Sequence, residues 1–461
     1  MRLWKGSVGG AFALIVAMMV TACGSGGQPQ ASTGKTVVTL AYSSNYVLDT
    51  TPLTTEYYNS IAKQFDAKYP HATVKLVPIA GSYTDIVDKL SLLYRSKSTA
   101  PDVAEMPTEQ IGGWASAGYL LPLNKYLPTS AWWSTFPSAV QGEGTFGGKV
   151  YAVNQGENDE FMYYDKTIFQ RAGLPVPWQP KTWQDIITAA QAIKAHVPGV
   201  SPLWVYSGNA SGASGVLQGS GNLLYGTTTP QIQDPQTGKW VVDSPGIRAV
   251  LGFYHAVDSL GLGAPVSDLF SPSGIGDPTT MFAKGQLGIA IGSNYYGGGW
   301  TKTVSAPYFP AAPSVIGVAP VPTENGQAPG SATTIGGWDL ALAASSPHPS
   351  YSWDLLNLME NAQNEVTVGN YAGFVPPSSQ YGKDPAFVNF APPFNAMSVQ
   401  VLPDGRSIPS SSNFAVWAYG FNEATGDMAL HPGMSVQAAL NVFKGYVTNQ
   451  LGASSVETIG G

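Results

Sequence analysis

Three carboxyl groups stand within four positions of this 461-residue sequence, on Glu157, Asp159 and Glu160. Two carboxyl groups that flank a glycosidic bond would be the machinery of a glycoside hydrolase. Neighbours in sequence are poor candidates to flank one bond, and no second, distant acid stands out. Carboxylates also accept hydrogen bonds from two adjacent hydroxyls, and such charge-assisted bonds are strong. The acidic run therefore favours binding of a hydroxyl-rich ligand, with a secreted glycoside hydrolase as the enzymatic alternative and a solvated loop as the structural one.

Metal-dependent and nucleophilic catalysis find less support. The five histidines are far apart in the sequence, and neither an H-E-x-x-H nor a G-x-S-x-G motif occurs. Gly34-Lys35-Thr36 ends like a phosphate-binding loop, but Pro29 stands where the first glycine belongs, and the stretch precedes a strand instead of following one. We therefore expect no enzymatic activity, no metal and no cofactor.

Aromatic residues are abundant, with 12 tryptophans and 23 tyrosines. An aromatic ring offers a flat face against which the C–H groups of a sugar pack well. Most tryptophans are nevertheless core residues, and we expect Trp132, Trp133 and Trp183 to be structural, with Thr182 as a helix cap before Trp183. The adjacent Tyr295 and Tyr296 would point to opposite sides of a strand-like segment, so only one of them is expected to face a cleft.

Composition limits the partners. Charged residues make up only 11% of the sequence, and the net charge is -7 without a basic patch. Phosphate binding needs clustered Lys and Arg, so nucleic acid is not an expected partner. About 425 residues follow Lys35, which is enough for two domains of ordinary size.

The only cysteine, Cys23, follows an export-signal pattern. Two basic residues precede an apolar run from Ala11 to Val20 that is too short to predict a membrane-spanning helix, and small residues stand directly before Cys23. This arrangement resembles the lipobox of bacterial lipoproteins, in which the cysteine thiol is lipidated and cleavage leaves it as the new N-terminus. We therefore expect a signal peptide over 1–22, a flexible lipidated tether over 23–35, and anchoring on the extracytoplasmic face of the cell membrane.

Strand-like and helix-like segments alternate in the first part of the chain, which predicts an α/β domain with a largely parallel sheet. Ligands of such sheets bind beyond the carboxyl ends of the strands, so the loops over 43–46, 81–83 and 105–110 are candidates for the binding site. Later segments continue the mixture. We predict strands over 36–42, 73–77, 102–104, 287–291, 315–318 and 340–343, and helices over 54–69, 84–94, 111–117, 183–196, 246–260, 351–361 and 436–447.

Several motifs occur in an order and spacing that are fairly specific together. They are Pro101-Asp102-Val103 with Gly112 to Leu120, Gly148 to Val153 with Tyr163 to Lys166, Pro180 to Trp183, Phe282 with Lys284-Gly285, Gly336-Gly337-Trp338, and Gly373 to Pro376. In this order and spacing they resemble the extracellular solute-binding proteins of the maltose-binding type (family 1), the receptors of sugar ATP-binding-cassette (ABC) importers. The similarity spans nearly the whole chain after the tether.

The resemblance implies an α/β, two-lobed, periplasmic-binding-protein-like fold of type II, in which hinge strands join the lobes and a cleft between them holds the sugar. Closure around the ligand is then a hinge motion. It also implies a monomer whose partners are a sugar, such as a di- or oligosaccharide, and the permease subunits of the ABC importer. A non-catalytic surface adhesin stays open as an alternative. The expected lobes are 36–160 with 317–365 and 161–316 with 366–461.

The resemblance also suggests ligand-contacting positions. Met106, Glu109 and Gln110 follow Asp102 where the family often has an aromatic residue, an acid and an arginine, so only Glu109 keeps the family's type and fine specificity for maltose does not carry over. Trp417 matches a stacking tryptophan before the final helix, whereas Trp338 could contact the sugar or pack between the lobes. The full set of expected ligand-binding residues is Ser44, Tyr83, Met106, Glu109, Gln110, Asn158, Asp159, Asn294, Tyr295, Trp338 and Trp417.

Overall fold

A computed structural model describes residues 34–44, 51–81, 83–271, 277–301, 307–411 and 413–460. The predicted signal peptide, Cys23 and nearly all of the predicted tether lie outside the described residues. Within the described ranges, no helix combines the length and apolar character that a membrane span requires.

The first lobe is built on a six-stranded mixed sheet. Its strand β1 is buried over residues 40–43, as expected of a central strand that pairs in parallel with a neighbour on each side. Helices pack on the sheet through a core that includes Tyr58, Phe65 and Leu340. The strands are β1 (Thr36–Ser43), β2 (Ala72–Ile79), β3 (Val103–Pro107), β6 (Ala152–Asn158), β12 (Thr333–Leu342) and β13 (Gly405–Ser407), and the main helices are α1 (Thr51–Lys68), α2 (Tyr83–Tyr94), α3 (Ile111–Ser116), α4 (Ser138–Glu143), α13 (Pro349–Met359) and α14 (Ala362–Ala372).

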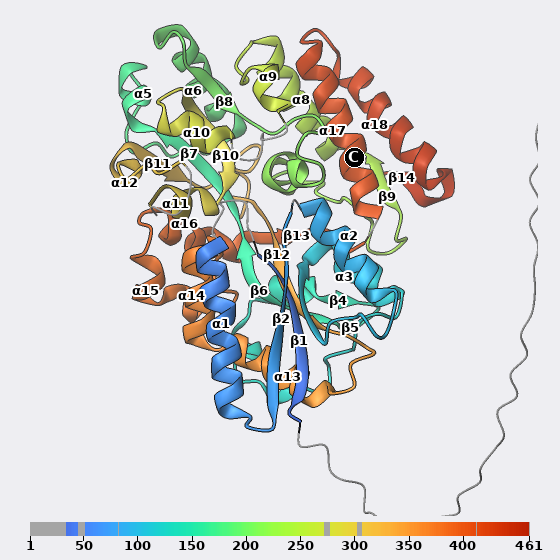
Figure 1. Cartoon of the computed structure of the whole chain (residues 1–461). Coiled ribbons are helices and arrows are strands. Elements are labelled where there is room, and N and C mark those ends of the chain that lie inside the picture. The colour runs from blue at the N-terminus through green and yellow to red at the C-terminus, as the bar shows by residue number, and fades with distance from the viewer. Residues whose placement is uncertain are drawn as a thin grey trace, which may run out of the picture. The chain divides into compact units, whose positions relative to one another are not determined.

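The second lobe contains a four-stranded sheet in the order β11-β7-β10-β8, with antiparallel pairs on both sides of β7. A large core joins this sheet to the helices around it, and Figure 1 shows α17 and α18 side by side in this part of the molecule. The elements are β7 (Glu160–Asp165), β8 (Ser201–Trp204), β10 (Leu287–Ser293), β11 (Ile316–Ala319), α5 (Lys166–Arg171), α6 (Trp183–His196), α8 (Pro245–Ser259), α17 (Asn413–Leu430) and α18 (Val436–Leu451).

Shorter elements complete both lobes. A hairpin joins β4 to β5, and β14 pairs in parallel with β9. A 3₁₀ turn over Thr108–Gln110 follows β3, and a π-helical turn over Val216–Ser220 leads into α7. The bounds are β4 (Thr145–Phe146), β5 (Lys149–Val150), α7 (Gly221–Tyr225), β9 (Trp240–Asp243), α9 (Val266–Leu269), α10 (Asp277–Ala283), α11 (Tyr295–Thr301), α12 (Ala312–Val315), α15 (Pro385–Val388), α16 (Phe394–Val401) and β14 (Val456–Thr458).

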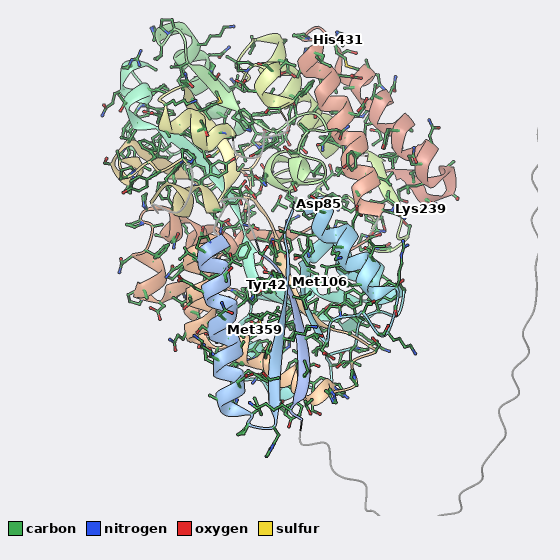
Figure 2. The ribbon with its side chains drawn as sticks, viewed as in Figure 1. Tyr42, Asp85, Met106, Lys239, Met359 and His431 are labelled. Carbon is green, nitrogen blue, oxygen red and sulfur yellow. The ribbon has the colours of Figure 1, made fainter. Side chains whose placement is uncertain are left out.

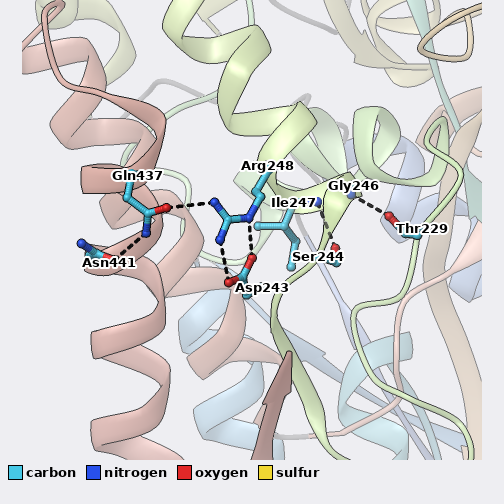
Figure 3. A network of polar contacts seen from close by, with 8 residues as sticks. All are labelled: Thr229, Asp243, Ser244, Gly246, Ile247, Arg248, Gln437 and Asn441. Atoms are coloured by element: carbon cyan, nitrogen blue, oxygen red, sulfur yellow. Dashed lines mark hydrogen bonds and ion pairs between the residues drawn. The ribbon is translucent and has the colours of Figure 1, made fainter. Parts of the chain in front are cut away.

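Helix starts in the second lobe follow simple capping chemistry. Thr182 and Asp185 form a capping box at the start of α6, which confirms Thr182 as the predicted cap. At the start of α8, the Ser244 hydroxyl accepts the backbone N–H of Ile247 at 3.1 Å. Next to it the Arg248 guanidinium donates two hydrogen bonds to the Asp243 carboxylate, at 2.8 and 2.9 Å, and a third to Gln437 of α18 (Figure 3).

The chain crosses between the lobes several times. Strand β6 pairs with β12 in the first sheet, and β7, only one residue later, pairs with β10 and β11 in the second, so Asp159 stands at a crossing. A second crossing links β11 to β12. The expected two-lobed α/β fold is therefore present, and the predicted parallel strands of the first lobe are confirmed.

The lobe boundaries differ from those expected at two places. All of β11 pairs with β7 in the second sheet, so the chain enters the first lobe near the start of β12 and not at residue 317. Residues of α14 and the following segment pack in the first lobe's core, so this lobe continues beyond residue 365. The physical reason is burial: apolar residues of α14 are buried in the core of the first lobe, whereas Ile316 of β11 is buried in the second.

Candidate functional site

A cavity of about 430 Å³ opens where elements of both lobes meet. This volume lies within the range of small-molecule sites in proteins. The first lobe contributes the end of β3, the 3₁₀ turn, the end of β6 and the start of β12, and the second lobe contributes the start of β7, the end of β10, the start of α11 and the π-helical turn. The lining residues are Gly81, Tyr83, Ile86, Pro107, Thr108, Glu109, Asn158, Glu160, Ser214, Leu217, Gln218, Ser293, Tyr295, Thr334, Ile335, Gly336, Gly337, Trp338, Ala372, Phe374 and Ile408.

Four aromatic side chains belong to the wall: Tyr83, Tyr295, Trp338 and Phe374. The hydroxyl of Tyr295 donates to Gln218 Oε1 at 2.9 Å, which fixes the orientation of the ring and occupies one amide oxygen. Tyr83 is the most accessible of the four, at 37% exposed, and accepts a hydrogen bond from the side-chain amide of Gln110. The wall thus contains aromatic side chains from both lobes.

Two carboxylic acids line the same cavity, Glu109 from the first lobe and Glu160 from the second. Burial raises the pKa of Glu109 to about 7. Burial also raises the pKa of Glu160 well above its ordinary value, and the neighbouring Asp159 adds to that shift. Glu160 Oε2 and the buried hydroxyl oxygen of Thr334 have no hydrogen-bond partner among the described residues. A ligand with hydroxyl groups could satisfy both atoms.

Amide groups near the crossing strands hold one another in place. The side-chain amide of Asn158 donates to Asn294 Oδ1 at 3.1 Å, and the Ser293 hydroxyl donates to the same oxygen at 3.2 Å. Asn294 therefore positions a side chain of the wall without lining the cavity itself.

Two glycines allow close backbone contacts at this site: Gly337 where β12 meets β6, and Gly373 where the end of α14 meets Tyr295. A Cβ on Gly337 would lie 2.0 Å from the carbonyl oxygen of Gly156 on β6, so only glycine allows this pairing next to Trp338. Gly373 ends α14 in the left-handed conformation, with φ of 78°, and a Cβ there would lie 2.8 Å from that of Tyr295. The conformation of Gly373 directs the chain into Phe374 of the wall.

The structure brings five of the expected ligand-binding residues together in the wall: Tyr83, Glu109, Asn158, Tyr295 and Trp338. Their contact with a ligand stays a prediction. Gln110 and Asn294 lie behind them and hydrogen-bond to Tyr83 and Asn158. Ser44 and Asp159 are buried outside the cavity lining, Ser44 at the end of β1 and Asp159 at the crossing between β6 and β7.

Met106 is not part of the wall. Its side chain is fully buried in the first lobe, in a core with Ile86, Leu90 and Trp114, and Figure 2 labels it among the strands of that lobe. We predicted strand β3 to end at residue 104, but it continues through Pro107, so the residues that reach the cavity are three to five positions later than the predicted end.

Trp417 is not part of the wall either. It lies in α17, is 1% exposed, and its indole N–H donates to the carbonyl oxygen of Val241 at 2.7 Å. The ring stacks on Phe421, with centroids 5.3 Å apart, and meets Phe443 of α18 edge-on. Helix α17 was not predicted from the sequence, and its burial against α18 makes Trp417 a core residue.

Of the adjacent Tyr295 and Tyr296, only one lines the cavity, as predicted, although the two residues are not in a strand. They begin the helix α11 instead of extending a strand. Tyr295 lines the cavity, while Tyr296 is fully buried and shares a hydrogen bond with the Tyr206 hydroxyl at 2.7 Å. Of the tryptophans predicted to be structural, Trp132 and Trp183 are buried, and Trp133 is partly buried against the core of the first lobe.

Several wall residues were not selected from the sequence. Glu160 belongs to the acidic run, and Phe374 belongs to one of the family-like motifs, so both had a signal. Thr108, Gln218 and Thr334 had none that distinguished them, because Gln218 lies in a Gly- and Ser-rich stretch without periodicity and Thr334 lies within an unpredicted part of β12.

Comparisons with known proteins give a consistent result. The family model described as "Bacterial extracellular solute-binding protein" matches residues 51–366. A probable ABC transporter-binding protein of Deinococcus radiodurans is 26% identical over 337 residues, which are 72% of this chain and 75% of that protein. The maltodextrin-binding protein MdxE of Bacillus subtilis is 25% identical over 364 residues, 77% of this chain and 75% of that protein. The crystal structure of the cyclic alpha-maltosyl-1,6-maltose binding protein of Arthrobacter globiformis superposes with a TM-score of 0.73 at 20% identity, covering 91% of this chain and all of that one.

Proposed function

This chain belongs to the bacterial extracellular solute-binding proteins, and from that membership we propose that it captures a carbohydrate between its lobes and delivers it to the permease of an ABC importer. The ligand that we propose is a di- or oligosaccharide. Relatives named for maltodextrin and cyclic maltosyl-maltose binding support the carbohydrate class.

The observation that carries this proposal is the composition of the cavity wall. Four aromatic rings from both lobes meet acids, amides and hydroxyls in one cavity. A sugar presents C–H faces and a rim of hydroxyls, so it needs ring faces and side chains that both accept and donate hydrogen bonds. The unpartnered Glu160 Oε2 and Thr334 Oγ1 are groups that such a rim would satisfy. Lobe closure at the β6–β7 and β11–β12 crossings would then bury the ligand.

The direct test is a calorimetric screen of the purified protein without its first 35 residues. We expect binding of at least one of maltose, maltotriose, maltotetraose and arabinotriose. In Trp338→Ala the affinity for the bound sugar should fall at least about tenfold, because a ring face of the wall is removed. The matched control is Tyr308→Ala, which removes an aromatic ring that is 52% exposed and does not line the cavity.

Two outcomes would contradict the proposal. Absence of binding across carbohydrates would leave the family membership intact but remove the sugar. Release of monosaccharides from an oligosaccharide would favour the glycoside hydrolase instead, with Glu109 and Glu160 as its carboxyl pair.

We also propose that the receptor is a monomer and that a lipid on Cys23 holds it at the membrane. Cys23 lies outside the described part of the chain. Such an anchor would keep the receptor near its transporter on the extracytoplasmic face. Expressed in a bacterium that processes lipoproteins, Cys23→Ser should appear in the medium or the soluble extracytoplasmic fraction and still bind sugar. A variant that stays in the membrane fraction would exclude Cys23 as the anchor.

A further inference from the structure

The charged side chains that line the cavity are all of one sign. The described lining residues include two carboxylic acids, Glu109 and Glu160, and no Lys, Arg or His. Arg406 stands two positions before the wall residue Ile408, but its side chain is exposed and is not part of the lining. Arg248 is not part of the lining either, and its guanidinium is hydrogen-bonded to Asp243 and Gln437 (Figure 3).

This distribution of charge works against an anionic ligand. A phosphate or carboxylate that enters a largely buried site loses its hydration, and the described lining offers no cationic side chain to compensate for that loss. Here the anion would also approach Glu109 and Glu160, whose own negative charge would repel it whenever either is ionised. A neutral sugar meets neither obstacle, since each acid can exchange hydrogen bonds with hydroxyls in its protonated or its ionised form.

Glu160 is the acid best placed to respond to a positive charge. Its side chain is 3% exposed; the carboxyl group is hydrogen-bonded to the Ser293 side chain, but Oε2 has no hydrogen-bond partner among the described residues. The backbone N–H of Glu160 donates to Thr333 Oγ1 at 2.7 Å, which holds this end of β7 against β12. An ammonium group on a ligand would supply the missing donor together with a compensating charge, and the faces of Tyr295 and Trp338 would favour a cation as well.

We propose that the cavity selects saccharides by charge: neutral and amine-bearing sugars bind in it, sugars that carry phosphate or carboxylate do not, and Glu160 is the residue that accommodates the amine. This inference rests on the proposed function, because it assumes a carbohydrate ligand. Beyond the proposed function, we infer which ligand charges the cavity accepts and that Glu160 is the residue responsible for binding the amine.

The test uses matched sugars that differ in charge. Maltose and maltotriose are compared with their aldonates, made by oxidation of the reducing end, and with their 1-amino-1-deoxy alditols, made by reductive amination. Trehalose is compared with trehalose 6-phosphate. In isothermal titration calorimetry at pH 7, we expect each anionic sugar to bind at least about 100-fold more weakly than its neutral partner. The amine-bearing sugar should bind at least as tightly as the reduced, uncharged alditol of the same length.

The variant Glu160→Gln separates charge from hydrogen bonding. Glutamine keeps an acceptor and a donor, but it carries no charge and cannot form an ion pair with an ammonium group. It should weaken binding of the amine-bearing sugar at least about tenfold more than binding of the neutral alditol. The matched control Glu423→Gln removes an acid on an exposed part of α17 and should leave the amine-to-neutral ratio unchanged.

The outcomes are distinguishable. If no neutral sugar binds the wild-type protein, the proposed function fails. If neutral sugars bind and the aldonates or trehalose 6-phosphate bind equally well, the charge selection is wrong while the proposed function stands. An amine-to-neutral ratio that is the same in Glu160→Gln and in the wild type would remove Glu160 from the role proposed here.

Discussion

Glu109 and Glu160 line the cavity, whereas Glu143, Glu157 and Asp339 are buried just behind it, in the interior of the first lobe. Burial raises the pKa of all five groups. For the interior acids, mutual repulsion adds to the shift. The difference between the two sets is access: a ligand can satisfy the cavity acids, but only protein groups and protons can satisfy the interior ones.

The same contrast holds for two tryptophans. Trp338 lies on β12 with part of its ring open to the cavity, while Trp417 is enclosed between α17 and α18. Residue type alone therefore did not separate a binding surface from a core. What separates them is whether a second element covers the side chain.

Replacement of Trp417 is the largest test of this contrast. Trp417→Ala removes a fully buried indole, its stacking on Phe421 and its hydrogen bond to Val241, and should lower the free energy of unfolding by about 3–5 kcal/mol. Trp338→Ala should cost clearly less stability, because part of that ring is already exposed. Urea unfolding followed by circular dichroism at constant pH measures both values.

Sugar affinity provides the matching control. Folded Trp417→Ala should bind sugar with wild-type affinity, whereas Trp338→Ala should not. If Trp417→Ala kept its stability and lost sugar binding, the tryptophan would be a ligand-stacking residue, as the family resemblance suggested, and the contrast between the two regions would fail.

Much of the fold was predictable because local signals and burial agree. The helix over 183–196 was predicted with its observed bounds, since apolar spacing, a capping threonine and an acidic third residue all coincide. The strand β1 was predicted within one residue for a similar reason. Strands β6 and β7 and the helix α17 were missed, because acidic residues in the strands and glycines in the helix conceal the pattern that their burial follows.

The site was less predictable because it depends on contacts between distant segments. Glu109 and Asn158 were identified, yet Met106 was misplaced by the extension of one strand. Gln218 and Thr334 reach the wall only through the π-helical turn and the crossing of β12. A sequence gives the residue types that a sugar requires, but not which of two adjacent tyrosines, or which of many tryptophans, another helix will cover.

The interior acids allow a smaller and more selective test, through pH. Glu157 and Glu143 interact with each other in the interior, and burial raises the pKa of Glu157 from 4.5 to about 8. The folded state therefore holds this proton more tightly than the unfolded chain does. The corresponding stability is fully present below pH 4.5 and is lost as the pH rises toward 8, by about 1.4 kcal/mol for each pH unit and each such group.

Glu157→Gln should make the dependence of the unfolding free energy on pH shallower between pH 5 and 8, by up to about 1.4 kcal/mol per pH unit, because glutamine does not titrate. Glu109 and Asp159, whose pKa values burial raises to about 7, act in the same direction and remain in the variant. Asp185, whose pKa is lowered by backbone hydrogen bonds at the start of α6, acts in the opposite direction, but it lies near the surface and counts for less.

Urea midpoints at each pH give the measurement, with the exposed Glu423→Gln as the control expected to follow the wild type. If the stability of the wild-type protein increased from pH 5 to 8, the interior acids would be ionised in the folded state. The proposed difference between the cavity acids, which a ligand can satisfy, and the interior acids, which are protonated, would then be wrong.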